Sequence, residues 1–152
     1  MPEVVAHEVR IDATPETVFT FFTDPAKLVE WMGEEATLDP RPGGICRIVF
    51  GPGVMCGSFS EVVPHSRLVF TWGWEQRYFE IPPGESRVEV TLTPHGGGTL
   101  VQLTHTGLPP TAIGFHTAGW EHYLERLGLA VGGAATGPDP LLALTRADDG
   151  VE

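Results

Sequence analysis

Two histidines, His105 and His116, are the residues of this sequence whose type and spacing could support chemistry. His105 alternates with Val101 and Leu103 in a strand-like run and therefore shares their apolar face. On a helix of 100° per residue, His116 falls about 40° from Trp120, on the side of the leucines. Two inward imidazoles could exchange protons with a bound molecule. Each could equally be a hydrogen-bonded core residue, and both interpretations stay open.

No second catalytic or metal-binding pattern accompanies the histidines. The sequence has no GxSxG, HExxH or CxxC motif, and its GPG and HGGG stretches are turns between strands and not phosphate loops. None of the six histidines pairs with another four residues away, as a helical metal site would require. We therefore assign no catalytic residue, no metal ligand and no cofactor, and we expect a binding protein more than an enzyme.

Tryptophans are concentrated near the same faces. Trp72 and Trp74 share one side of a strand-like run with Leu68 and Phe70, and Trp120 lies on the helix that must cover that side. Large rings on two facing layers can fill a core. They can also keep the layers apart and leave an aromatic pocket with a few polar groups, which is the usual composition of a small-molecule site.

The elements that position these residues follow from caps and turns. Residues 3–12 read as a strand, and Thr14-Pro15 and Asp24-Pro25 each place an N-cap before a proline, which predicts two short helices. Six strand-like runs follow, separated by Gly- and Pro-rich turns. These runs are EATLDP, ICRIVF, VMCGSFSEVV, RLVFTWGW, RVEVTLTP and TLVQLTH.

A long amphipathic helix is predicted over residues 111–131, after Pro109-Pro110 and before Gly132-Gly133. One sheet with a single apolar face and one amphipathic helix must cover each other, which predicts an α+β fold with a curved antiparallel sheet around the helix. Gly119 interrupts this helix, and we expect it to allow another element to approach closely. We expect one domain over residues 1–131 and a Gly-, Ala- and Pro-rich acidic tail over 132–152.

Charge and cysteine content narrow the function classes. The net charge of −11 opposes binding to nucleic acid or to an anionic membrane surface, and no apolar run is long enough to span a membrane. The N-terminus lacks the apolar core of a secretion signal, so we expect a cytoplasmic protein. Cys46 and Cys56 flank the GPG turn, where they could be cross-strand neighbours, and we expect both to be reduced.

The ordered segments TDPAKLVEWMG, DPRPGGICRI, GSFSEVVPHSRLVFTWGWE, VEVTLTPHGGGTLVQLTHTGLP and HTAGWEHYLERL resemble the SRPBCC (START-like, Bet v-like) superfamily. The similarity is to the branch of the activator of the heat-shock-protein-90 ATPase, over about residues 5–130. Its motif positions here are Trp31, Gly43, Gly44, Gly57, Pro64, Trp72, Gly98, Gly119 and Trp120.

The resemblance implies a helix-grip fold: a seven-stranded antiparallel sheet around a long C-terminal helix, with two short helices after the first strand. It also implies a cavity between sheet and helix that takes lipids, polyketides, hormones or other apolar molecules. The residues we expect to bind such a ligand are Trp31, Phe70, Trp72, Trp74, Val90, Leu103, His105, His116, Trp120 and Leu124.

Three functions follow as alternatives. The first is a non-catalytic carrier or sensor of a small apolar ligand, the second a polyketide cyclase or dehydratase type of enzyme, and the third a protein-interaction module, with a homodimer as one form. A chaperone partner is not expected, because the eukaryotic activator does much of its chaperone binding through a separate N-terminal domain that this sequence lacks.

Overall fold

The computed structural model describes residues 4–51, 53–75, 81, 84–134 and 136, and it confirms the predicted order of elements. Seven antiparallel strands form one sheet in the order β1-β7-β6-β5-β4-β3-β2. The strands are β1 (Val5–Ile11), β2 (Glu35–Leu38), β3 (Ile45–Phe50), β4 (Gly53–Val63), β5 (Arg67–Trp72), β6 (Ser86–His95) and β7 (Gly98–Thr106). The helices are α1 (Pro15–Thr23), α2 (Pro25–Leu28) and α3 (Pro110–Val131).

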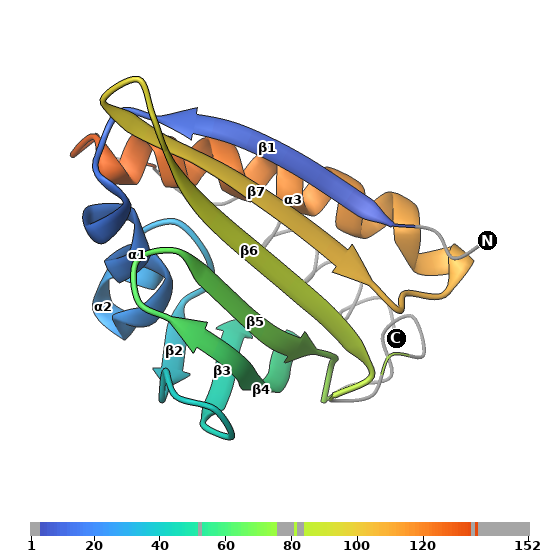
Figure 1. Ribbon diagram of the computed structural model, residues 1–152. Helices are drawn as coiled ribbons and strands as arrows, with labels where there is room; N and C mark the ends of the chain where they lie inside the picture. The colour runs from blue at the N-terminus through green and yellow to red at the C-terminus, as the bar shows by residue number, and fades with distance from the viewer. Residues whose placement is uncertain (1–3, 52, 76–80, 82–83, 135, 137–152) are drawn as a thin grey trace.

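The sheet curves and α3 lies along it, while α1 and α2 lie at the end nearest the C-terminus of α3 (Figure 1). The apolar face of the sheet, which carries Phe70, Val90 and Leu103, is buried beneath this helix. The opposite face carries Arg67, whose guanidinium pairs with the carboxylates of Glu61 and Glu89 at 3.1 and 2.6 Å. The predicted helix-grip arrangement, with one apolar and one wet sheet face, is therefore confirmed.

The short helices begin where the sequence predicts them. Thr14 Oγ1 accepts a hydrogen bond from the amide of Thr17, and Asp24 Oδ1 accepts one from the amide of Ala26. Helix α2 ends at Leu28, because the chain tightens into turns after that residue. These turns bury Trp31 completely, and its Nε1 donates to the carbonyl of Phe21 at 2.9 Å.

Gly57 marks a close crossing of two strands. A Cβ atom on Gly57 would lie 1.9 Å from the carbonyl oxygen of Thr71, so no larger residue fits there without a backbone shift. This motif glycine therefore allows two neighbouring strands to approach closely.

The first residues of the expected tail turn back onto the domain. Arg126 of α3 donates to the carbonyl oxygens of Trp31 and Thr136, and the Thr136 hydroxyl donates to the carbonyl of Glu30. Position 135 and the tail from position 137 onward lie outside the described residues. No helix in the described part of the chain is both long and apolar enough to cross a membrane.

The two cysteines are free thiols on opposite faces of the β3–β4 hairpin. Cys46 pairs with Gly57 and Cys56 pairs with Arg47, so the two cysteines lie on neighbouring strands, one register position apart. A one-residue step along a strand turns the side chain to the other face. Cys46 is buried, and this burial raises the pKa of its thiol to about 12, whereas Cys56 is partly exposed.

We predict that one thiol of the native protein reacts with a thiol reagent near pH 8, and that both react after denaturation. The thiolate is the reactive form, and the raised pKa of Cys46 leaves almost none of it. A Cys56→Ser variant should show no fast-reacting thiol in its native state. Two fast thiols in the native wild type would contradict the burial of Cys46.

Candidate functional site

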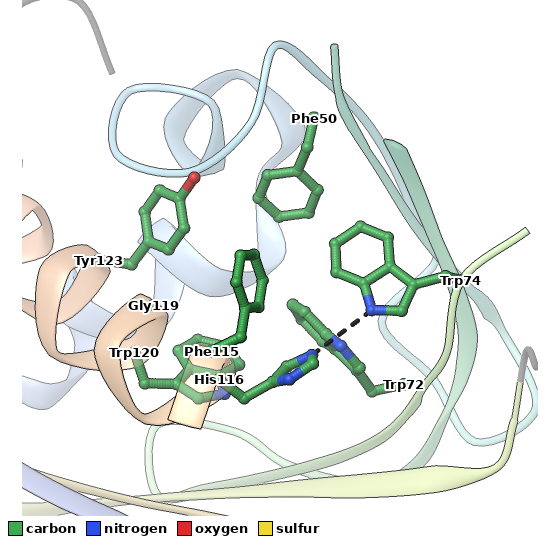
Figure 2. Close-up of a pocket in the computed structure, with 8 residues that line it drawn as sticks. All are labelled: Phe50, Trp72, Trp74, Phe115, His116, Gly119, Trp120 and Tyr123. Carbon is green, nitrogen blue, oxygen red and sulfur yellow. Dashed lines mark hydrogen bonds between the residues drawn. The ribbon is translucent and has the colours of Figure 1, made fainter. Parts of the chain in front are cut away.

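A small aromatic pocket lies between the N-terminal half of α3 and the ends of β3 and β5 (Figure 2). Its volume is about 30 Å³. A single water needs roughly 10–15 Å³, so the pocket has room for about two waters. The residues that line it are Phe50, Trp72, Trp74, Phe115, His116, Gly119, Trp120 and Tyr123.

Phe115 forms the solvent side of the pocket. It is 39% exposed, whereas every other lining residue is buried. Figure 2 shows its ring pointing into the space between Tyr123, Phe50 and Trp74. Phe115 is therefore the lining residue that borders solvent.

Gly119 opens the helix side of the pocket. Apart from its chain neighbours and the backbone of its own helix, no heavy atom lies within 4 Å of the position that a Cβ atom on Gly119 would occupy, so the expectation of a close contact with another element is wrong. The missing side chain leaves space among the rings. Glycine costs about 1 kcal/mol relative to alanine inside a helix, and the empty space shows that sterics do not require it here.

Aromatic rings form the remaining walls. The Trp72 ring lies 5.1 Å from that of Trp120 and 5.8 Å from that of Trp74, and the Phe50 ring lies 5.6 Å from Trp74 and 5.8 Å from Tyr123. These separations are typical of edge-to-face and tilted aromatic pairs. The walls are therefore mostly aromatic and carry no formal charge.

His105 lies beneath the pocket in a chain of hydrogen bonds. The Nε1 of Trp120 donates to His105 Nδ1 at 3.0 Å, so Nδ1 carries no proton. In the neutral ring Nε2 is then the protonated nitrogen, and it donates to Ser86 Oγ at 2.8 Å. The Ser86 hydroxyl in turn donates to the carbonyl of Trp72 at 2.6 Å. His105 cannot take the Ser86 proton in this arrangement, so the pair does not form an activated nucleophile.

His116 presents its second nitrogen to the pocket. His116 Nδ1 donates to the carbonyl of Ala112 at 2.9 Å, which leaves Nε2 as the acceptor of the Trp74 indole at 3.4 Å (Figure 2). The two imidazole rings lie 5.4 Å apart. Burial lowers the pKa of His105 to about 3, with a further contribution from His116, and burial also lowers the pKa of His116.

Four of the ten expected ligand-binding residues line this pocket: Trp72, Trp74, His116 and Trp120. The other six are buried elsewhere: Trp31, Phe70, Val90, Leu103, His105 and Leu124. Trp31 packs against Phe22 at a ring separation of 5.1 Å, beside the other half of α3. Val90 and Leu103 are register partners in the filled centre of the sheet.

Sequence reasoning missed four lining residues: Phe50, Phe115, Gly119 and Tyr123. Tyr123 flanks the apolar stripe of the helix, and Phe50 belongs to the inward-facing alternation of ICRIVF, so both signals were present. Within the described residues, no cluster of three or more His, Cys, Asp or Glu side chains could hold a metal ion.

The lowered histidine pKa values predict acid sensitivity. The unfolded His105 ring binds a proton below about pH 6.5 and the folded ring does not until about pH 3, so stability falls as the pH drops through this window. From pH 6.5 to 5.0 this single group should remove roughly 1–2 kcal/mol from the free energy of unfolding.

Urea unfolding at several pH values measures the loss, and a titration of the ring signals by NMR assigns it. A His95→Gln variant is the matched control, because His95 is exposed, and it should keep the wild-type pH dependence. A wild-type free energy of unfolding that is equal at pH 6.5 and 5.0 would contradict the buried neutral state of His105.

Residues 12–132 match the family model described as Activator of Hsp90 ATPase homolog 1-like protein. The solution structure of an AHSA1-like protein from Rhizobium etli is similar at 42% identity and a TM-score of 0.70, over 92% of this chain and 88% of that chain. A search of curated proteins gives no match.

Two further solved structures share the fold at lower identity. DynU16, a protein in the dynemicin biosynthetic locus, has a TM-score of 0.76 at 24% identity, over 90% of this chain and 50% of that chain. The Aha1 dimer of Colwellia psychrerythraea has a TM-score of 0.74 at 18% identity, over 85% of this chain and 96% of that chain. With a family model that spans most of the domain and the helix-grip fold described above, this chain belongs to the family of Activator of Hsp90 ATPase homolog 1-like proteins, within the SRPBCC superfamily.

Proposed function

We propose that the protein binds a small, uncharged aromatic molecule in the pocket between α3 and the sheet, as a carrier or sensor. The observation that carries this proposal is the empty space beside Gly119 at the centre of a ring of aromatic side chains. A protein core would gain stability from a side chain at that position, since alanine would also improve the helix. Glycine at position 119 provides neither of these stabilising effects. A ligand that occupies the space would explain why a glycine stands there.

The volume of the closed pocket implies a movement on binding. Small-molecule sites usually measure about 300–1,000 Å³, and this pocket measures about 30 Å³. Phe115 is the lining residue with an exposed ring, so its rotation toward solvent costs the least buried contact. We propose that the ligand enters past Phe115 and replaces its ring among Phe50, Trp74 and Tyr123.

A cyclase or dehydratase type of enzyme is the second candidate, and His116 is the observation that favours it. The lowered pKa keeps its ring neutral near pH 7, and Nε2 faces the pocket as a base could. However, the described lining residues include no carboxylate that could orient the ring or share its proton. We therefore place binding ahead of catalysis.

The domain boundaries, the cellular location and the oligomeric state are also proposals. We propose a single domain over 1–131 with the acidic tail 132–152, a cytoplasmic location, and a homodimer as a possible assembly, since the Colwellia psychrerythraea protein of the same fold is a dimer. Light scattering of the purified chain would measure the assembly directly.

We predict that Gly119→Leu reduces the binding of an environment-sensitive apolar dye at least tenfold, because its side chain occupies the space of the ligand. Phe115→Ala should have the opposite effect and strengthen the binding of a bulky dye, because it removes the ring at the pocket mouth.

The matched control is Gly114→Leu, which makes the same change at an exposed position of the same helix, where there is also no steric conflict. It should bind dye like the wild type. Equal dye binding by wild type, Gly119→Leu and Phe115→Ala would rule out this pocket as the binding site.

A further inference from the structure

The indole nitrogen of Trp72 is buried without a partner. Trp72 is 4% exposed, and within the described part of the chain its Nε1 has no hydrogen-bond acceptor. An unpaired buried donor is unfavourable, and native structures contain few of them. Trp72 is also one of the residues that line the pocket.

A count of donors and acceptors explains why Trp72 is the residue left over. Three indoles surround the two imidazoles, and each neutral imidazole offers one acceptor nitrogen. His105 Nδ1 accepts from Trp120, and His116 Nε2 accepts from Trp74. The site therefore has one indole donor more than it has imidazole acceptors, and an acceptor atom has to come from another source.

We infer that the ligand carries a neutral oxygen acceptor, of the aryl carbonyl class, and that this oxygen accepts the hydrogen bond of Trp72 Nε1. This inference rests on the proposed function, because it concerns the ligand of the same pocket. The described lining residues include no lysine or arginine that could neutralise a carboxylate or phosphate, so the oxygen belongs to an uncharged group. The surrounding aromatic walls favour a flat ring next to that group.

In Figure 2 the Trp72 side chain lies among those of Trp74, His116 and Trp120. The ring centroids of Trp72 and His116 are 6.2 Å apart, and those of Trp72 and Trp74 are 5.8 Å apart. A ligand oxygen at the Trp72 nitrogen would thus lie on the polar side of the pocket, with its ring toward the space beside Gly119. In this way Trp72 selects ligands that carry a hydrogen-bond acceptor, whatever their size.

The test compares two ligands that differ in one group, acetophenone with its C=O and α-methylstyrene with its C=CH₂. We expect the wild type to bind acetophenone about tenfold more tightly, which corresponds to one neutral hydrogen bond. Trp72→Phe should abolish this preference. Trp31→Phe is the control and should retain it, because Trp31 lies outside the pocket and donates to the carbonyl of Phe21.

A second measurement does not depend on the folding of Trp72→Phe. The four tryptophans give four indole N–H signals by ¹⁵N NMR, which can be assigned through single Phe substitutions of the other three. The Trp72 signal should move downfield with acetophenone and not with α-methylstyrene. Equal affinity for both ligands, with no selective shift, would overturn the inference and leave pocket binding intact. Failure of both ligands to bind would overturn the proposed function itself.

Discussion

A chain of buried hydrogen bonds fixes how α3 lies on the sheet. It runs from the Trp120 indole through the His105 ring and the Ser86 hydroxyl to the backbone of Trp72, and thus joins α3 to β7, β6 and β5. Buried polar groups must be paired, and each one left unpaired would cost about 1–3 kcal/mol. A helix that rotated or slid by one residue would break the Trp120–His105 bond, so the chain selects one position that apolar packing alone would not specify.

The uneven packing under α3 follows from this fixed position. Toward its C-terminus, Leu124 and Leu127 are buried, and Arg126 ties the helix to the backbone of Trp31. Toward its N-terminus, Trp120 is held on His105, and the large rings of the sheet keep the two layers apart. Gly119 offers no side chain to fill the gap, and the pocket lies there. The same element thus closes the core at one end and leaves it open at the other.

The periodicity of the sequence predicted which face of α3 is buried. It did not predict where along the helix axis each residue meets the sheet. It placed His116 and Trp120 on the buried side of α3, and caps such as Thr14 were read correctly, because these signals are local. It could not tell that Trp31 lies at the filled end of α3 and Tyr123 at the pocket, since that depends on where the helix is docked. In a sequence, a glycine that permits a close contact looks the same as a glycine that leaves empty space. For this reason the role of Gly119 was predicted wrongly.

The electrostatics of the site are set by local burial and not by the total charge of the chain. A net charge of −11 should favour protonated imidazoles, yet the pKa values of His105 and His116 are lowered, with desolvation as the main cause. Charges at the surface are screened over about 8–10 Å by salt, whereas desolvation acts at the ring itself. Both rings therefore stay neutral, and each keeps one acceptor nitrogen for an indole. Protonation of His105 would turn that acceptor into a donor facing the Trp120 N–H, so the neutral state is a condition for the docking of α3 as well as for an uncharged pocket.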